Sequence, residues 1–229
     1  MAIASIIIAA NAMVQIGCVG KKAFKMLPIT VTQKQAAGLD LVMQAEYDYR
    51  VMQAKLITDP NGNRSTFGFT PLGLMERSAV MGKTTETVGD DLQNAPGSLL
   101  NYNFHEFYQY KRPIWVETTK REYHIHDADI PVDADANATI TMREYTDGFG
   151  RLLQSRVQAE DVIFGDPTFG DSGLPADQGT NGNAVGIQRA ANTAMNVIVS
   201  GWTVYDNKGR PVEKYEPFFS KGFVYSPVL

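Results

Sequence analysis

The sequence predicts a mainly β protein that is built from antiparallel hairpins in series. From residue 25 onward, segments rich in Val, Ile, Thr, Tyr and Phe recur, and these residue types are enriched in strands. Several segments, such as ITMREY and WVETTKREYHIH, alternate apolar with polar residues, so each is expected to have one buried and one exposed face. Clusters of Gly, Pro, Asn and Asp separate the segments, as turns between strands would.

The alternation also predicts the order of the elements. We expect strands within residues 26–33, 46–59, 64–70, 113–127, 138–147, 151–161, 195–206, 210–219 and 222–227. Helical periodicity is weak, and the best helical candidate, residues 89–110, is interrupted by Pro96 and Gly97. Because short segments and turn residues follow one another in this way, the expected arrangement is a meander of hairpins.

Composition and charge are those of an ordinary globular protein. The 229 residues are 44% hydrophobic and 20% charged, which is enough to bury a substantial core. The formal net charge of −4 argues against a general nucleic-acid binder, which usually presents a basic face, and no nucleic-acid partner is expected. Cys18 is the one cysteine of the sequence, so an intramolecular disulfide is excluded.

Residues 1–24 form an apolar N-terminal segment of uncertain status. The segment is apolar over residues 2–20 and then basic, whereas a signal peptide carries its positive charge before the apolar run. Asn11 and Gln15 interrupt the run, which is barely long enough for a membrane helix, and no stable membrane insertion is expected. The open alternatives are a docked strand or helix, a segment that needs a missing neighbour, a processed or membrane segment, and a truncated end.

Residues 164–186 differ in amino-acid composition from the rest of the β domain that is expected over residues 25–229. Gly, Asp, Pro and Asn are dense there and little can be buried, which predicts a long loop between two strands. The aspartates can supply the oxygen ligands that calcium prefers, but no spacing matches a known calcium loop. A flexible insertion is therefore the favoured interpretation.

A recurring phrase indicates how the hairpins are closed. It reads Tyr-Asp-x-x-Gly-Arg at residues 205–210 and, with one extra residue, Tyr-Thr-Asp-x-x-Gly-Arg at residues 145–151. Residues 57–64 end in Asp-x-x-Gly-x-Arg, and residues 69–74 have the same outline with Phe, Thr and Leu in place of Tyr, Asp and Arg. We expect the Asp or Thr side chain to cap each turn and the Gly to supply the positive φ that the turn requires.

These phrases resemble the YD repeats of the Rhs family. The fuller resemblance is to the B component of bacterial insecticidal toxin complexes, the TcdB/TcaC-like proteins, in its middle-to-C-terminal region. It covers residues 27–229 and is carried by four stretches in the order expected of that family. The stretches are AEYDYRVMQAKLITDPNGNRSTFGFTPLGL (45–74), RPIWVETTKREYHIHD (112–127), REYTDGFGRLLQSRVQAE (143–160) and VSGWTVYDNKGRPVEKYEPFFS (199–220).

The resemblance implies a structural role. In that family, the B component joins a C component to form a hollow shell of coiled β-sheet, which encloses a toxic effector before a translocating A component delivers it. The implied protein is secreted, and its partners are a C-component-like Rhs protein and, through regions absent here, an A component. Enzyme activity and self-cleavage belong to the C component, so no catalytic residue, cofactor or metal ligand is expected here. The chain departs from the family in being several times shorter than a full B component.

A His-x-His pair, His124 and His126, is the most enzyme-like feature of the sequence. On a strand both rings would project from the same face. With Asp127, Asp129 or His105 they can bind zinc or another transition metal. Such a pair arises easily by chance, so two polar residues on the exposed face of a strand are the favoured interpretation.

Two carboxylate pairs are the next candidates. Asp90 with Asp91, and Asp133 with Asp135, can do acid–base chemistry only if a cleft separates their pKa values. We expect residues 127–137 to form a polar turn region between two strands instead.

Two alternatives to the shell interpretation remain open. One is a stand-alone β-rich metal-dependent hydrolase that uses His124 and His126. The other is a surface or carbohydrate-binding β module, because YD repeats also occur in bacterial surface proteins and aromatics such as Trp115 and Trp202 can stack on sugars. Aromatic residues at strand positions are more often part of the core.

Overall fold

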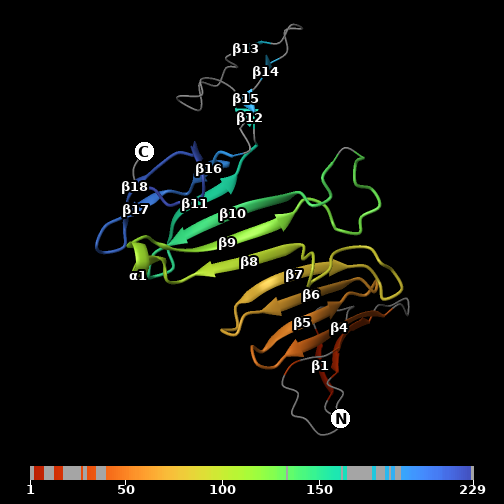
Figure 1. Cartoon of the computed structure of the whole chain (residues 1–229). Helices are drawn as coiled ribbons and strands as arrows, with labels where there is room; N and C mark the ends of the chain where they lie inside the picture. The colour runs from red at the N-terminus through yellow and green to blue at the C-terminus, as the bar shows by residue number, and fades with distance from the viewer. Residues whose placement is uncertain are drawn as a thin grey trace. The chain divides into compact units, whose positions relative to one another are not determined.

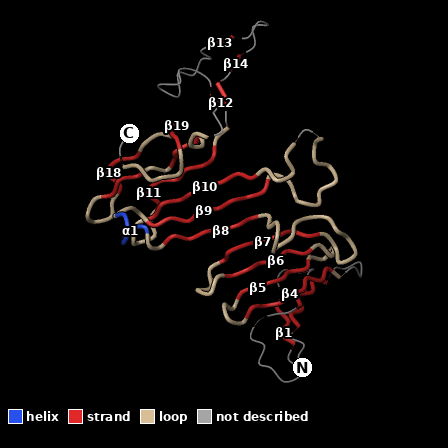
Figure 2. The backbone as a smooth tube through the Cα atoms, in the orientation of Figure 1, coloured by secondary structure: helices blue, strands red, loops and turns tan. Residues whose placement is uncertain are grey.

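The described part of the chain is almost entirely strands and turns. A computed structural model describes residues 3–7, 13–17, 27, 30–34, 40–132, 134–160, 162–163, 177–178, 184–185, 187–188 and 192–227. Helix α1 (Glu106–Tyr110) is the one helix among these residues (Figure 2). No helix in this part of the chain has the length and apolar character needed to cross a membrane. The predicted mainly β, antiparallel fold is confirmed.

The chain divides into two compact units. The first contains residues 1–100 and 120–139, and the second contains residues 101–119 and 140–229. In the first unit the strands follow one another in the order β1-β2-β3-β4-β5-β6-β7-β8, and Figure 1 shows β4 to β7 as successive neighbours. Their bounds are β1 Ile3–Ile7, β2 Met13–Gly17, β3 Thr30–Lys34, β4 Leu41–Asp48, β5 Gln53–Thr58, β6 Arg64–Phe69, β7 Met75–Met81 and β8 Ser98–Asn103.

The first unit is a continuous antiparallel ladder with little core. One register row runs through Ala45, Ile57, Ser65 and Val80 on four successive strands. Most described side chains of β4 to β7 are half-buried, and Ala79 is the buried hydrophobic residue among the described residues of this unit. Both faces of this sheet therefore remain largely accessible in the described part of the chain.

The second unit contains a sheet of order β9-β10-β11-β16-β19 and several two-stranded ribbons. The sheet strands are β9 Ile114–Arg121, β10 Thr139–Thr146, β11 Leu152–Gln158, β16 Asn196–Ser200 and β19 Phe218–Lys221. The ribbons pair β12 Val162–Ile163 with β15 Ile187–Gln188, β13 Asp177–Gln178 with β14 Ala184–Val185, and β17 Thr203–Tyr205 with β18 Pro211–Lys214.

The core of the described residues is concentrated in the second unit. Tyr145, Val197, Val199 and Trp202 are buried there. The Trp202 ring stacks on Tyr215, with ring centroids 4.3 Å apart. Aromatic stacking of this kind adds to the area that each ring buries. Trp202 is thus a core residue, as expected for an aromatic at the start of a strand.

Several predicted strands are divided, shortened or absent in the structure. Residues 46–59 form the end of β4, a turn and β5, and residues 195–206 divide into β16 and β17 at Gly201, whose φ is +62°. The strand expected over 113–127 ends at Arg121, and residues 222–227 form no strand. A positive φ cannot continue a strand, so the break at Gly201 follows from its backbone conformation.

Strands β7 and β8, and the short strands β12 to β15, lie outside the strand ranges expected from the sequence. β8 lies inside residues 89–110, the best helical candidate, of which only α1 is helical. Pro96 and Gly97 break that segment, and Ser98 and Leu99 at the start of β8 pair with β7 instead of continuing a helix.

The two segments of uncertain status are only partly described. Within residues 1–24, β1 and β2 pair with each other and β2 pairs with β3, so the described residues form the strand alternative. Within residues 164–186, a short antiparallel pair joins β13 and β14. The rest of both segments lies outside the described residues.

Candidate functional site

The turn at residues 206–210 shows how the recurring phrase closes a hairpin. Asp206 N–H donates to the Arg210 carbonyl (2.9 Å), and Gly209 N–H donates to the Asp206 carbonyl (2.9 Å). The Asp206 carboxylate accepts from the Lys208 and Arg210 N–H groups, both at 2.9 Å, and from Arg210 Nε at 2.8 Å. Gly209 has φ +78°, so the turn needs glycine there.

The turn at residues 147–151 repeats this geometry. Asp147 Oδ1 accepts from Phe149 N–H (2.9 Å) and Arg151 N–H (3.0 Å), while Arg151 Nε donates to Asp147 Oδ2 (2.6 Å). Gly150 has φ +77°, and the register shifts at Tyr145/Thr146 as a β-bulge requires.

Two further turns keep the geometry with different side chains. Asp59 Oδ1 accepts from Asn61 and Asn63 N–H at 2.8 Å, and Gly62 has φ +89°. In the turn at residues 70–74, Thr70 Oγ1 accepts from Leu74 N–H at 3.1 Å, and Gly73 has φ +85°. The predicted roles of the Asp or Thr cap and of the positive-φ glycine are therefore confirmed in all four phrases.

The hydrogen bonds within the turns also shift the pKa values of the aspartates that accept them. The N–H and guanidinium donors of Arg210 lower the pKa of Asp206 below its ordinary value of 3.8. Partial burial acts to raise the pKa of Asp147, but the bonds from Arg151 and Phe149 outweigh it and the pKa is lowered. These carboxylates are charged caps, and nothing in the geometry poises them as proton donors at neutral pH.

Two arginines of the first unit, at or beside the turns that follow β4 and β5, bind the backbone of the connection two strands further along the chain. Arg50 Nη1 donates to the carbonyls of Thr70 and Pro71, both at 2.9 Å. Arg64 Nε donates to the Gly82 carbonyl at 2.9 Å, and its Nη2 donates to the Lys83 carbonyl at 3.2 Å. Each guanidinium donates to two backbone carbonyls of a turn, and two of these, the Thr70 and Lys83 carbonyls, also accept an N–H group within that turn. These contacts join non-consecutive turns at the sheet edges.

In the second unit the corresponding contact is a ring contact. The Arg151 guanidinium lies 4.5 Å from the centroid of the Tyr205 ring. A side chain at Gly209 would also meet this guanidinium, so the turn at 206–210 packs closely on Arg151. The aromatic and the arginine of two different phrases therefore bind one another.

A cluster of side chains on β10 and β11 binds the backbone of residues 222–226, which we call the C-terminal segment. Arg156 Nη1 donates to the Gly222 carbonyl (2.9 Å), and Tyr145 Oη donates to the Phe223 carbonyl. Gln154 Nε2 reaches the Ser226 carbonyl at 3.4 Å. The segment is thus bound by side chains that recognise its backbone instead of by a strand ladder.

Burial shapes the electrostatics of this cluster. It lowers the pKa of Arg156 and raises the pKa of Tyr145, because burial disfavours the charged form of each. Arg143 lies 4.0 Å above the Trp115 ring centroid and pairs with Glu117 at 2.6 Å. The cluster is a packed structural network, and Trp115 serves in it as a partner of Arg143.

The expectation that His124 and His126 share a strand face is wrong. Both residues lie after the end of β9, in the connection to β10, where Ile125 and His126 form a turn. His124 Nδ1 bonds Asp90 Oδ2 at 2.9 Å. No group of three or more His, Cys, Asp or Glu side chains among the described residues is arranged to hold a metal ion. The shared strand face on which the metal-hydrolase alternative relied is therefore not formed.

The carboxylate pairs also separate. Asp90 is buried against His124, whereas Asp91 caps a local turn by accepting from Asn94 Nδ2 at 2.7 Å. Asp135 caps Asn137 N–H at 2.8 Å within the polar connection between β9 and β10, and Asp133 lies outside the described residues.

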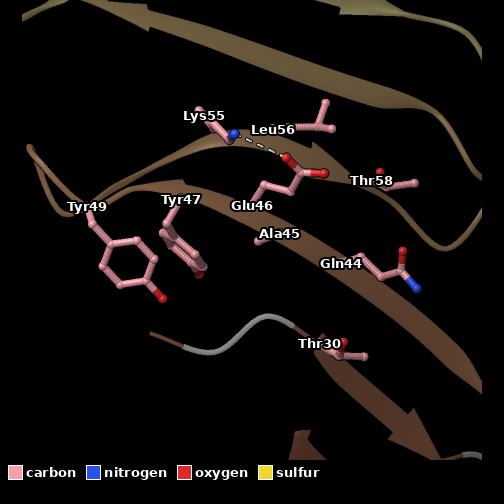
Figure 3. A pocket seen from close by; sticks show the side chains of 9 residues that line it. All are labelled: Thr30, Gln44, Ala45, Glu46, Tyr47, Tyr49, Lys55, Leu56 and Thr58. Atoms are coloured by element: carbon pink, nitrogen blue, oxygen red, sulfur yellow. Dashed lines mark ion pairs between the residues drawn. The ribbon is translucent and has the colours of Figure 1, made fainter. Parts of the chain in front are cut away.

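A shallow depression of about 510 Å³ lies on β4 and β5 (Figure 3). Its lining is mainly polar and includes the ion pair between Lys55 Nζ and Glu46 (3.3 Å). Tyr47 and Tyr49 stand side by side at one end, with ring centroids 6.3 Å apart. The tilted rings present no common flat surface, so this depression gives no particular support to a sugar platform.

Comparison with known proteins shows what the fold is similar to. No protein-family model matches the chain, and no curated protein matches it. The crystal structure of TcdB2-TccC3-Cdc42 is similar to this chain with a TM-score of 0.51, at 18% identity over 84% of the chain. The crystal structure of TcdB2-TccC3-TEV is similar with a TM-score of 0.51, at 16% identity over 91% of the chain.

The likeness is one of fold. At 18% and 16% identity, it confirms the Tc toxin resemblance predicted from the sequence at the level of the fold. The chain spans 12% and 13% of the two chains it matches, so it corresponds to a small part of each.

Sequence reasoning missed two arrangements in which a buried charged side chain bonds a residue far away in the sequence. The Asp90–His124 contact joins residues 34 positions apart, and the contact of Arg156 with Gly222 joins residues 66 positions apart. The available signal for the Arg156 contact was the polar residues Arg143, Gln154 and Arg156 inside two predicted strands.

Proposed function

We propose that the chain is a shell component of a toxin complex, of the kind that its sequence resembles. Strips of antiparallel sheet with Rhs/YD-type turns would close around an effector polypeptide and keep it enclosed until delivery. The observation that carries the proposal is the fold shared with TcdB2-TccC3 structures over 84% and 91% of this chain.

The turn geometry supports the same role. A shell must hold many hairpins in a fixed lateral spacing, and a lone hairpin is only marginally stable. Arg50, Arg64 and Arg151 connect turns that are not consecutive in the sequence. These side-chain contacts link turns in addition to the strand ladder, as expected for the wall of a shell that encloses another polypeptide.

The proposal includes partners and a location. A C-component-like Rhs protein would complete the shell, and a translocating A component would act through other regions of the complex. The protein would act outside the producing cell as a secreted complex. The role is structural, and it assigns no catalytic residue to this chain.

Co-expression with Rhs-type proteins encoded beside this chain tests the proposal. One of them should carry a flexible, protease-sensitive reporter as cargo. We expect a stoichiometric complex by size-exclusion chromatography, in which trypsin cleaves the reporter at least about tenfold more slowly than free reporter. A matched preparation without this chain is the control. Equal cleavage in both preparations, or failure of every candidate partner to co-elute, would overturn the shell function.

A further inference from the structure

A cavity of about 410 Å³ lies on the first unit and shares no lining residue with the depression in Figure 3. Ile57, Ser65 and Val80, which are cross-strand neighbours on β5, β6 and β7, form its floor. Its walls come from the two long connections of this unit, residues 82–97 and residues 122–138. Long ordered connections in a compact domain usually serve a function, whereas the turns of the recurring phrase are short.

The two walls are tied together at a buried carboxylate. Asp90 is only 5% exposed, and its Oδ2 lies 2.9 Å from His124 Nδ1. Its Oδ1 accepts from Ile125 N–H at 3.3 Å, and His126 N–H donates to the Gly89 carbonyl at 3.0 Å. The walls are therefore held in place by contacts that need no ligand.

Glycine allows one wall to lie directly on the sheet. Gly89 has φ +100°, and a side chain there would collide with the Val80 carbonyl. A side chain at Gly82 would likewise collide with Val88, which also lines the cavity. The cavity is thus preformed by close backbone packing, which reduces the entropy that a ligand must overcome on binding.

The rim presents acceptors and negative charge. His124 contacts the Asp90 carboxylate through Nδ1, and the tautomer that donates from Nδ1 presents Nε2 as an acceptor. Asp127 Oδ1 accepts from Asp129 N–H at 3.1 Å, and its second oxygen has no bond among the described residues. Asp59 also lines the cavity and contributes negative charge, with its two oxygens accepting from Asn61 and Asn63.

The neighbouring cations are occupied elsewhere. Arg64 donates to the Gly82 and Lys83 carbonyls, and Lys83 Nζ lies 3.4 Å from Glu86. The rim is consequently acidic and rich in acceptors, above a floor to which Ile57 and Val80 contribute apolar surface. A ligand that complements both parts has a cationic donor on a short apolar chain.

We propose that this cavity binds a primary alkylammonium group, carried either by a free amine or by a lysine side chain. The ammonium is held at the rim by Asp127 and His124, and the alkyl chain covers Ile57 and Val80. This inference goes beyond the shell function and does not depend on it.

Titration of the full chain with pentylammonium chloride tests this inference. Isothermal titration calorimetry should give saturable binding at least about tenfold tighter than for pentanol or ammonium chloride, which each lack one half of the ligand. The imidazole NMR signals of His124 should shift along the same isotherm. Nα-acetyl-lysine methylamide separates the two sources: equal affinity favours a polypeptide lysine, and affinity about tenfold weaker than pentylammonium favours a free amine.

Three variants make the test specific. Asp127→Asn and Val80→Ser should each weaken binding about tenfold, while Glu46→Gln, which removes a carboxylate from the separate depression in Figure 3, should leave it unchanged. Circular dichroism identifies any variant that has not folded. Absence of saturable binding, equal affinity for pentanol, or equal losses in Asp127→Asn and Glu46→Gln would overturn the proposal.

Discussion

At the residue scale, the turns depend on an acceptor at the first position and a glycine three residues later. Asp206 and Thr70 both accept the N–H group of the residue four positions on, so the cap needs an oxygen and not a charge. Glycine has no such substitute in the four phrases, because its positive φ is costly for every residue with a Cβ.

Gly148 and Gly150 lie in one turn, but only Gly150 has a positive φ, so substituting each by Ala isolates the cost of that backbone conformation. Gly150→Ala should lower the free energy of unfolding by about 1–2 kcal/mol, because φ is +77° and no atom lies within 4 Å of a new Cβ. Gly148→Ala should be close to neutral, since it has open space and no positive φ. Urea unfolding measures both. Equal effects would show that backbone strain does not control this turn.

The capping acids should make stability fall in acid. Asp147 and Asp206 have pKa values lowered from 3.8 in the folded state, so their contribution is complete above that value and is lost as the pH falls through the folded pKa. We expect the melting temperature to drop below about pH 4. The Asp147→Asn/Asp206→Asn variant should melt lower at pH 7 but show a smaller drop in acid. An unchanged acid profile would contradict this assignment.

The sequence was a good guide at this scale because the turn is a local object. Its acceptor, its glycine and its donors lie within five residues, so spacing alone predicted the roles of Asp59, Thr70, Asp147 and Asp206. The environment of His124 was mispredicted because its partner, Asp90, belongs to a different connection. Local patterns contain no information about which loops meet.

At the element scale, the C-terminal segment is bound to β10 and β11 without joining their sheet. Arg143 and Tyr145 lie opposite Arg156 and Gln154 in the ladder, so the four side chains form one patch on one face. Tyr145, Gln154 and Arg156 donate to backbone carbonyls of the C-terminal segment, which forms no strand and so has no sheet partner for these carbonyls. Buried donors are costly to leave unpaired, so patch and segment stabilise one another.

Removing the guanidinium at the centre of this patch should release the segment. Arg156→Met leaves the Gly222 carbonyl and Gln154 Oε1 without their donor and should cost about 2–3 kcal/mol. Arg210→Met, whose side chain is 71% exposed, should cost about 0.5 kcal/mol. Urea unfolding and chymotrypsin cleavage after Tyr225 report the two effects. Similar stability and cleavage in both variants would refute the role of Arg156.

Element boundaries were harder to predict than element type. The strand character of residues 113–121 was visible in their alternation, but nothing local stopped the pattern before His126. β8 was hidden because its residues, SLLNYN, fit either a helix or a strand, and pairing with β7 decided between them. Tertiary pairing thus overrode a weak local preference.

At the scale of the whole molecule, the sheet of the second unit has a face that is not covered in the described part of the chain. Met142, Val157, Ile198 and Phe219 are cross-strand neighbours on four successive strands and form one apolar row. Ile198 and Phe219 are 37% and 56% exposed. An apolar row on an exposed sheet face indicates a surface that associates with another polypeptide.

The row ends on β19, the last strand in the order of its sheet, so face and edge can both contact a second chain. We expect the isolated chain to self-associate and Phe219→Glu to lower its association constant at least about tenfold, because a charge would then have to be buried. Phe149→Glu is the matched control, since Phe149 is 88% exposed in a turn away from the row. Light scattering across a concentration series measures both variants. If they behave alike, the effect is one of net charge, and the apolar row is not the contact surface.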